Sequence, residues 1–220
     1  MESNTKSIVT RIATPADYKY AESIASEMAY SAAKRGTGIA NRTPEYILNK
    51  MKDGQAVIAI DTENDTWAGF SCMEVWEHEK YVAKSGLIVA PDYRGIGISK
   101  SIKTTLFELC RTKFPRAKLF SLSTSPAVMH INLELGYRVV PNEEILQDEL
   151  FLRGCTSWVN YVELMNKQHT ELPYVAMVYD PSKEATLSVV PAMVNPDVKQ
   201  EAIICDASFS EVNLGAVAAI

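Results

Sequence analysis

The stretch LIVAPDYRGIGISKSIKTTLFELCRTK, from Leu87 to Lys113, decides the fold that this sequence predicts. It opens with an apolar run, Leu87–Val89, and continues through a loop with two glycines. Apolar residues then recur at three- and four-residue steps from Ile98 to Leu109, the spacing of one helix face. The order is therefore strand, glycine-containing turn, helix. The first turn of such a helix has unpaired N–H groups and the positive end of the helix dipole, so we expect it to hold phosphate oxygens.

The loop at Arg94–Ser99 (RGIGIS) excludes two common phosphate-binding motifs. The nucleoside-triphosphate loop requires G-x-x-x-x-G-K-S/T, a spacing that this stretch does not supply. The dinucleotide motif G-x-G-x-x-G fails because Lys100 occupies the position of the third glycine. The remaining pattern, R-x-x-G-x-S, resembles the pyrophosphate-binding signature of the GNAT acyltransferases, Q/R-x-x-G-x-G/A, and departs from it at Ser99. The alternative is an ordinary turn that contains two glycines.

A second motif strengthens this resemblance. A helix predicted to begin at Ser125-Pro126 ends with Leu135-Gly136-Tyr137, which matches the L-G-F/Y ending of the corresponding GNAT helix. Both motifs stand in the family's order with the expected elements between them, and the resemblance covers residues 7–181. It implies an α/β (α+β) GNAT fold, with a mixed, mostly antiparallel central sheet that is splayed between two strands and flanked by helices.

The rest of the chain supplies the elements for this fold. Strands are predicted at residues 7–13, 55–61, 66–78, 81–90, 118–123, 137–140, 158–165 and 174–179. Helices are predicted from Thr14-Pro15 to about Lys34, from Thr43-Pro44 to Met51, after the glycine loop, from Ser125, and at residues 142–152. Residues 182–220 form a C-terminal extension beyond the domain at 1–181. Its apolar content indicates that it packs on this domain or on a partner subunit, as in a homodimer.

Composition excludes several classes of function. The chain has 220 residues and a formal net charge of −5, which gives no signal for nucleic-acid binding. No apolar stretch approaches the roughly 20 residues of a membrane span, and the N-terminus lacks the apolar core of a signal peptide. The four cysteines include no CxxC pair, which favours a reducing environment. We therefore expect a cytoplasmic protein without membrane or nucleic-acid partners.

The resemblance to GNAT enzymes implies that acetyl-CoA, or another acyl-CoA, is the co-substrate and that no metal is needed. The acyl-CoA would lie in the cleft where the strands at residues 81–90 and 118–123 splay apart. Backbone groups of the first strand would align the pantetheine, and amides of the loop would hold the pyrophosphate. The cofactor-binding residues implied in this way are Leu87, Ile88, Val89, Arg94, Gly95, Ile96, Gly97, Ile98 and Ser99.

Direct attack of an amine on a thioester requires a group that removes a proton from the acceptor. Strand alternation places Phe70, Cys72, Glu74, Trp76 and His78 on one face. Glu74 is the first candidate for the base, because it is a carboxylate beside aromatic bulk. His78 is the second, because histidine is suited to proton transfer near neutral pH. The alternatives are that Glu74 pairs with a lysine or binds the substrate ammonium, and that His78 is a surface residue.

An acid that protonates the leaving thiolate is harder to identify. Many GNAT proteins carry a tyrosine four residues before the glycine of the L-G-F/Y motif, and this sequence has Asn132 there. Asparagine donates a hydrogen bond but cannot deliver a proton. His130 is near in sequence and is an alternative, and a thiolate can also leave without an acid. The sequence therefore leaves the acid open.

Further traits resemble a narrower group, the N-acetylglutamate synthase type of GNAT protein associated with arginine biosynthesis. They are RGTGIA from Arg35, TPEYI from Thr43, WVNY from Trp158 and VYDP from Val178. This resemblance implies an amino acid such as glutamate as the acceptor. Arg35 and Arg42 flank a glycine-containing loop and suit carboxylates, which a guanidinium binds bidentately, and Trp76 would lie on the same side. The alternative is that Arg35 caps its helix and that Arg42 is merely exposed.

Three functions remain in competition. The first is transfer of an acetyl or succinyl group from CoA to the amine of a small amino acid such as glutamate. The second is GNAT chemistry on another amine, such as a polyamine, an antibiotic, a protein N-terminus or a lysine, for which an acidic cleft is expected. The third is a non-catalytic sensor of acyl-CoA or an amino acid. Asn132 favours the sensor, and Glu74 together with the intact loop favours turnover.

Overall fold

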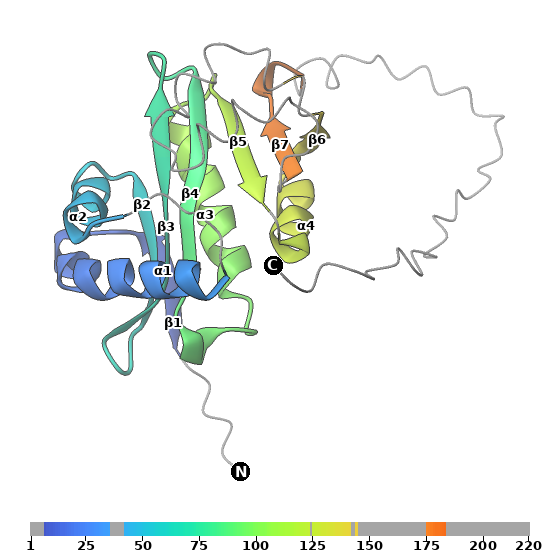
Figure 1. Cartoon of the computed structure of the whole chain (residues 1–220). Helices are drawn as coiled ribbons and strands as arrows, with labels where there is room; N and C mark the ends of the chain where they lie inside the picture. Colours follow the sequence, from blue (N-terminus) through green and yellow to red (C-terminus); the bar gives the residue numbers. More distant parts are fainter. Residues whose placement is uncertain (1–6, 36–41, 124, 142–143, 145–174, 184–220) are drawn as a thin grey trace, which may run out of the picture. The chain divides into compact units, whose positions relative to one another are not determined.

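The computed structural model describes residues 7–35, 42–123, 125–141, 144 and 175–183. They form a seven-stranded sheet in the order β1-β2-β3-β4-β5-β7-β6, flanked by helices (Figure 1). The strands are β1 (Ile8–Ile12), β2 (Ala56–Asp61), β3 (Thr66–Trp76), β4 (Tyr81–Val89), β5 (Lys118–Ser123), β6 (Arg138–Val140) and β7 (Val175–Tyr179). The helices are η1 (Pro15–Tyr20), α1 (Ala21–Arg35), α2 (Pro44–Lys52), η2 (Pro91–Tyr93), α3 (Ile98–Lys113) and α4 (Pro126–Glu134). Among the described strands only β4 and β5 pair in parallel, which confirms the predicted mixed, mostly antiparallel sheet.

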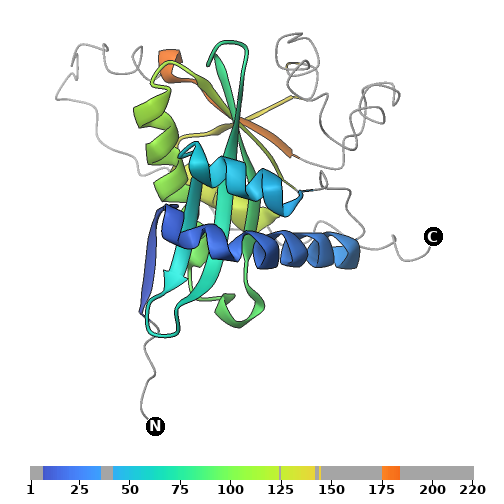
Figure 2. The ribbon, with the colours of Figure 1, turned by 90° about the vertical axis from the view of Figure 1, so that its left-hand side faces the viewer.

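Different helices cover the two faces of the sheet (Figures 1 and 2). α1 and α2 pack on one face, where Ile24, Ile47 and Phe70 are fully buried. α3 packs on the other face through Ile102 and Leu106, which are also fully buried. The apolar stripe of each helix therefore meets one side of the same sheet, and burial of that stripe stabilises both layers.

The sheet is splayed between β4 and β5 (Figure 1). These strands pair only over Tyr81–Ala83, opposite Lys118–Phe120. Beyond Ala83, no strand in the described ranges pairs with that edge of β4. On its other edge β4 pairs with β3 as far as Val89, with a register shift beside Gly86, whose φ is +64°. The predicted splay is confirmed, and it leaves a strip of β4 backbone unpaired on one side.

The first helix and the third strand differ from the sequence prediction. The helix starts as the 3-10 helix η1, which Thr14 and Asp17 cap reciprocally, and it becomes α-helical at Ala21. β3 ends at Trp76 rather than at residue 78. The chain turns there because three consecutive residues have positive φ, namely Glu77 (50°), His78 (53°) and Glu79 (66°). The prediction that His78 is a strand residue on the same face as Glu74 is therefore wrong.

Several predicted elements lie outside the described residues. They are the helix at 142–152, apart from Glu144, the strand at 158–165 and all but the first two residues of the extension at 182–220. The described residues all belong to one compact unit, residues 1–188. Within these residues, no helix has both the length and the apolar character needed to cross a membrane.

Candidate functional site

The loop before α3 has the backbone geometry of an anion-binding turn. Gly95 and Gly97 have φ of +79° and +88°, in the left-handed region that favours glycine, and a Cβ on either would meet nothing within 4 Å. Gly97 is the N-cap of α3, and the first intrahelical bond is made by the amide of Lys100 (N–O 3.0 Å). The amides of Ile98 and Ser99 precede that bond, and the first turn contains no acidic residue. Both features favour an anion in the open space beside the loop.

The predicted cofactor-binding residues divide into two groups. The loop positions Arg94, Gly95, Ile96 and Gly97 are exposed, and Ser99 is half-buried. Leu87 and Val89 pack toward the α3 face beside the unpaired edge of β4. The side chains of Ile88 and Ile98 are buried in the two cores and can contribute only through their backbone.

The side chain of Arg94 holds the loop in place. Its Nε donates to the carbonyl oxygen of Val89 (3.1 Å), and its Nη2 lies 2.9 Å from Oε1 of Glu27 in α1. The start of the loop is thus tied to the end of β4 and to a helix on the other face of the sheet. This anchoring fixes the position of the loop relative to the open edge of β4.

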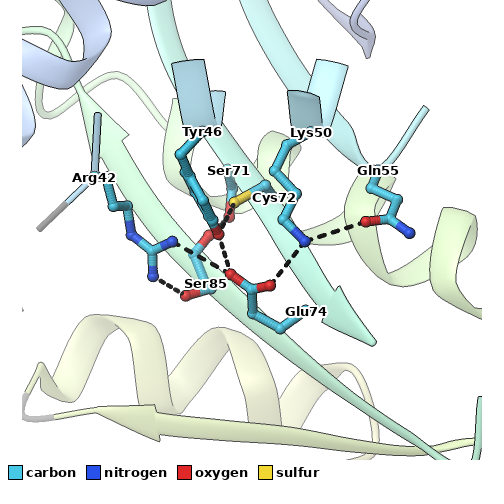
Figure 3. A network of polar contacts seen from close by, with 8 residues as sticks. All are labelled: Arg42, Tyr46, Lys50, Gln55, Ser71, Cys72, Glu74 and Ser85. Atoms are coloured by element: carbon cyan, nitrogen blue, oxygen red, sulfur yellow. Dashed lines mark hydrogen bonds and ion pairs between the residues drawn. The ribbon is translucent and has the colours of Figure 1, made fainter. Parts of the chain in front are cut away.

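A network of charged and polar side chains lies on the α1/α2 face of β3 and β4 (Figure 3). Glu74 of β3 is its centre. Its Oε2 lies 2.7 Å from Nζ of Lys50, and its Oε1 lies 3.4 Å from Nη1 of Arg42 and accepts a hydrogen bond from the hydroxyl of Tyr46. Nη2 of Arg42 donates to Oγ of Ser85. We call these five residues the Glu74 network.

The electrostatics of the Glu74 network leave one positive charge in excess. Burial raises the pKa of Tyr46 far above its ordinary value, so its hydroxyl stays protonated and donates. Burial opposes the charge of Arg42, but its neighbours, the Glu74 carboxylate among them, raise its pKa, so the guanidinium stays charged. Two cations therefore surround one carboxylate. Nε of Arg42 is buried without a hydrogen-bond partner in the described chain, which leaves a cationic donor unused.

The structure tests where each predicted acceptor-side residue lies. Both oxygens of Glu74 are engaged, and its pairing with Lys50 is the alternative that the sequence had left open. Arg42 is not merely exposed, because only 7% of its side chain is accessible.

His78 is exposed in the turn between β3 and β4. Trp76 is half-buried and stacks on Tyr81, with ring centroids 5.8 Å apart and planes at 13°. Arg35 is the last residue of α1, and its side chain is not among those that the structure describes.

Asn132 is fully buried at the splay rather than exposed to solvent. Its Nδ2 donates to Oγ of Ser121 in β5 (2.9 Å) and lies 3.6 Å from Sδ of Met177 in β7. Asn132, at the position that the resemblance links to an acid, thus lies in a buried polar environment. Its Oδ1 is a hydrogen-bond acceptor without a partner in the described residues.

Sequence reasoning missed Tyr46, Lys50 and Ser85 of the Glu74 network. Tyr46 and Lys50 are four residues apart on α2 and therefore share a face, a signal that helical spacing contains. Ser85 had no comparable signal, because its role depends on the register between β3 and β4. Among the residues that the structure describes, no three or more His, Cys, Asp or Glu side chains gather in a way that could hold a metal ion.

No protein-family model matches this chain, and no curated protein matches it in sequence. Comparison with solved structures does find similar proteins. N-acetylglutamate synthase from Neisseria gonorrhoeae, complexed with coenzyme A and N-acetyl-glutamate, aligns with a TM-score of 0.53 and 14% identity over 79% of this chain. This chain spans only 35% of that synthase.

Two further structures match over most of their own length. A Mycobacterium tuberculosis protein in complex with CoA has a TM-score of 0.57 and 16% identity, covering 78% of this chain and 98% of that one. A GNAT superfamily phosphinothricin acetyltransferase from Sinorhizobium meliloti, in complex with acetyl-CoA, has a TM-score of 0.52 and 18% identity, covering 79% and 88%. At such identities the likeness establishes the fold. This chain therefore has the fold of the GNAT acetyltransferases.

Proposed function

We propose that this chain is an acyl-CoA-dependent N-acyltransferase that transfers an acetyl or succinyl group to the amine of a small amino acid such as glutamate. The observation that carries the proposal is the splay between β4 and β5, which opens beside the anion-binding loop of α3. The open glycines, the unpaired amides of the first turn and the unpaired edge of β4 fit a pyrophosphate with an extended arm. Structures with this fold that contain CoA or acetyl-CoA support the same assignment.

The residues of this chain would form two binding sites, one for acyl-CoA and one for the acceptor. Amides from Arg94 to Ser99 would hold the pyrophosphate, and backbone groups of Leu87 and Val89 would align the arm that carries the thioester. Bound acyl-CoA supplies the acyl group, and the acceptor amine attacks it directly. Holding both reactants in one cleft lowers the entropic part of the barrier.

The acceptor side is proposed to bind a carboxylate. The Glu74 network has an excess positive charge and a buried donor, Nε of Arg42, without a partner in the described chain. A carboxylate suits a guanidinium with free N–H groups. The Neisseria synthase, whose structure contains N-acetyl-glutamate, supports an amino acid as acceptor. Glu74 remains our candidate for the base, acting directly or through a water, and a basic amine is less suited to this cationic surface.

A sensor without turnover is the second candidate, and Asn132 favours it. This residue is fully buried and cannot deliver a proton, so the position that the resemblance links to an acid is chemically inert. The sensor and the enzyme share the same loop and cleft. They differ in whether bound acyl-CoA is consumed.

The test is CoA release from acetyl-CoA and from succinyl-CoA, with glutamate, aspartate, ornithine and spermidine as acceptors. We expect turnover with glutamate, and we expect Arg42→Gln to raise the KM for glutamate about 10- to 100-fold, the range of a lost charged hydrogen bond. Arg116→Gln removes an exposed arginine and is the matched control.

Other outcomes would separate the alternatives. Turnover with spermidine alone would refute the carboxylate acceptor but not acyl transfer. Tight CoA binding without CoA release from any combination of acyl-CoA and acceptor would refute the enzyme and support the sensor. Failure of the chain to bind CoA at all would refute both.

A further inference from the structure

A second buried polar cluster lies on the α3 face of the sheet, at the point where β4 and β5 separate. Lys84 and Ser121 directly follow Ala83 and Phe120, the last paired residues of the two strands. Asn132 is bonded to Ser121 across this point. Lys84 and Ser121 therefore flank the apex of the splay.

The amine of Lys84 is buried without a hydrogen-bond partner in the described residues, although the residue as a whole is half-buried. Nζ lies 4.3 Å from the ring centroid of Tyr137 and 5.4 Å from that of Phe107. Two other buried polar atoms near this apex, Oδ1 of Asn132 and the hydroxyl of Tyr137, also have no partner there. Unsatisfied buried groups are rare in folded proteins and call for a functional explanation.

The titratable groups around this amine do not neutralise it. Lys103 and Cys110 face it from α3, and Tyr137 faces it from the segment before β6. Burial lowers the pKa of Lys84 well below that of an ordinary lysine, and the charge of Lys103 lowers it further. Burial raises the pKa of the Cys110 thiol to about 12 and that of the Tyr137 hydroxyl well above its usual range, so both stay neutral. Lys84 is thus an amine that readily gives up its proton.

The location of Lys84 matches the reach of CoA. Lys84, Leu87 and Val89 lie on the same face of β4, and the loop of α3 follows the end of that strand. The stretch from Lys84 to Val89 spans about 17 Å at about 3.3 Å per residue. An extended pantetheine arm has a comparable length. A pyrophosphate at the loop would therefore place the thioester sulfur near the apex of the splay.

We propose that Lys84 is the acid that protonates the CoA thiolate as it leaves, an inference that rests on the proposed acyl transfer. The acceptor nitrogen forms a bond to the carbonyl carbon, the C–S bond breaks, and one proton moves from Nζ of Lys84 to sulfur. Neutral Lys84 then regains a proton from solvent, which has received the proton lost by the acceptor. A buried ammonium whose proton affinity is lowered by its surroundings transfers its proton more readily than an ordinary lysine does. Lys84 supplies the proton that Asn132 cannot.

The first test compares steady-state kinetics of the wild type and Lys84→Met over pH. We expect kcat to fall about 100-fold in the variant, the lower end of general acid catalysis because a thiolate is a good leaving group, with little change in the KM for acetyl-CoA. The wild-type kcat should fall as the pH rises past the lowered pKa of Lys84, and the variant should lack this alkaline limb. Lys103→Met should move the wild-type limb to higher pH, because the charge of Lys103 lowers the proton affinity of Lys84. Lys80→Met removes an exposed lysine before β4 and is the control.

The second test does not depend on turnover and uses the affinity for CoA and for desulfo-CoA, which lacks the sulfur. Near neutral pH the wild type should bind CoA several-fold more tightly than desulfo-CoA, because the thiol of CoA and the amine of Lys84 share one proton in the complex. Lys84→Met should remove this difference and leave the affinity for desulfo-CoA unchanged. The variant should also have a melting temperature at least equal to that of the wild type, since it replaces an unpaired buried amine.

Three outcomes would overturn the inference. The first is unchanged kcat and an unchanged alkaline limb in Lys84→Met. The second is a raised KM with unchanged kcat, which would make Lys84 a binding residue. The third is equal loss of affinity for CoA and desulfo-CoA. If the wild type releases CoA and the variant behaves in one of these ways, the role of Lys84 is refuted and the proposed function stands. If the wild type binds no CoA, the proposed function fails with it.

Discussion

Two neighbouring residues of β4, Lys84 and Ser85, point to opposite faces of the sheet and meet opposite electrostatic environments. Ser85 joins the Glu74 network, in which Glu74 pairs with Lys50 and with Arg42. The amine of Lys84 lies among aromatic rings and a second lysine, without a hydrogen-bond partner in the described chain. Strand alternation puts them on opposite sides of the same backbone.

The difference indicates two roles for buried charge. In the Glu74 network two cations pair with one carboxylate, so the network holds α2 against β3 and β4, and removal of Glu74 would leave both cations unpaired. At Lys84 the folded state contains a buried amine without a hydrogen-bond partner in the described residues. Substitution of Lys84 by an apolar residue should therefore stabilise the folded state. A buried amine with a strongly lowered pKa marks a candidate functional site, and this idea underlies the assignment of Lys84 as an acid.

Substitution of Glu74 by glutamine is expected to produce the largest change. It leaves the buried cations Arg42 and Lys50 without their carboxylate, and we expect the free energy of unfolding to fall by about 3 kcal/mol. Urea unfolding measures this. Glu79→Gln, in the exposed turn after β3, is the control and should have little effect. A stability equal to that of the wild type would mean that the Glu74 network does not hold this face together, and the contrast with Lys84→Met would then disappear.

Substitution of Lys103 by methionine should have a smaller effect that depends on pH. Burial lowers the pKa of Lys103 to about 8, below the value of about 10.4 in an unfolded chain. The unfolded state therefore binds more protons between these two values, and the penalty is complete below pH 8 and disappears as the pH rises toward 10.4. Lys103→Met should be about 2 to 3 kcal/mol more stable than the wild type at pH 7, at about 1.4 kcal/mol for each pH unit between the two pKa values, with the difference near zero at about pH 10.5.

Urea unfolding of both proteins at several pH values measures this dependence. Lys52→Met removes an exposed lysine and should show no such trend. A constant difference across the range would show that Lys103 is not desolvated in the folded state, which would also weaken the account of Lys84.

Substitution of Tyr46 by phenylalanine should have the smallest effect. It removes one hydrogen bond to Glu74 but keeps the ring that lies 4.8 Å from the guanidinium carbon of Arg42. We expect a loss of about 1 kcal/mol in thermal or urea unfolding, because both cations still pair with the carboxylate. Tyr30→Phe changes an exposed tyrosine and controls for the loss of a hydroxyl. A loss as large as that of Glu74→Gln would make Tyr46, rather than the ion pairs, the centre of the Glu74 network.

Much of the fold was predictable from local patterns. The apolar periodicity from Ile98 to Leu109 matches the buried face of α3, and the glycines before it have the positive φ that their residue type favours. The end of β3 was missed because three non-glycine residues take positive φ, which only the closure of the hairpin imposes. The Glu74 network was predicted in part: its carboxylate and one arginine were identified, whereas Tyr46, Lys50 and Ser85 were not.

The amino-acid sequence by itself determined the order of strands and helices and the glycine loop at the start of α3, because these depend on steric preferences and periodicities within a few residues. Only the tertiary structure decided which charges are paired. Arg42 and Glu74 are joined by the register of β3 with β4 and by the packing of α2, whereas Lys84 meets Tyr137 and Lys103 because β5 leaves β4 at Ala83. Burial and pairing depend on contacts between segments far apart in the chain, and no local pattern encodes them.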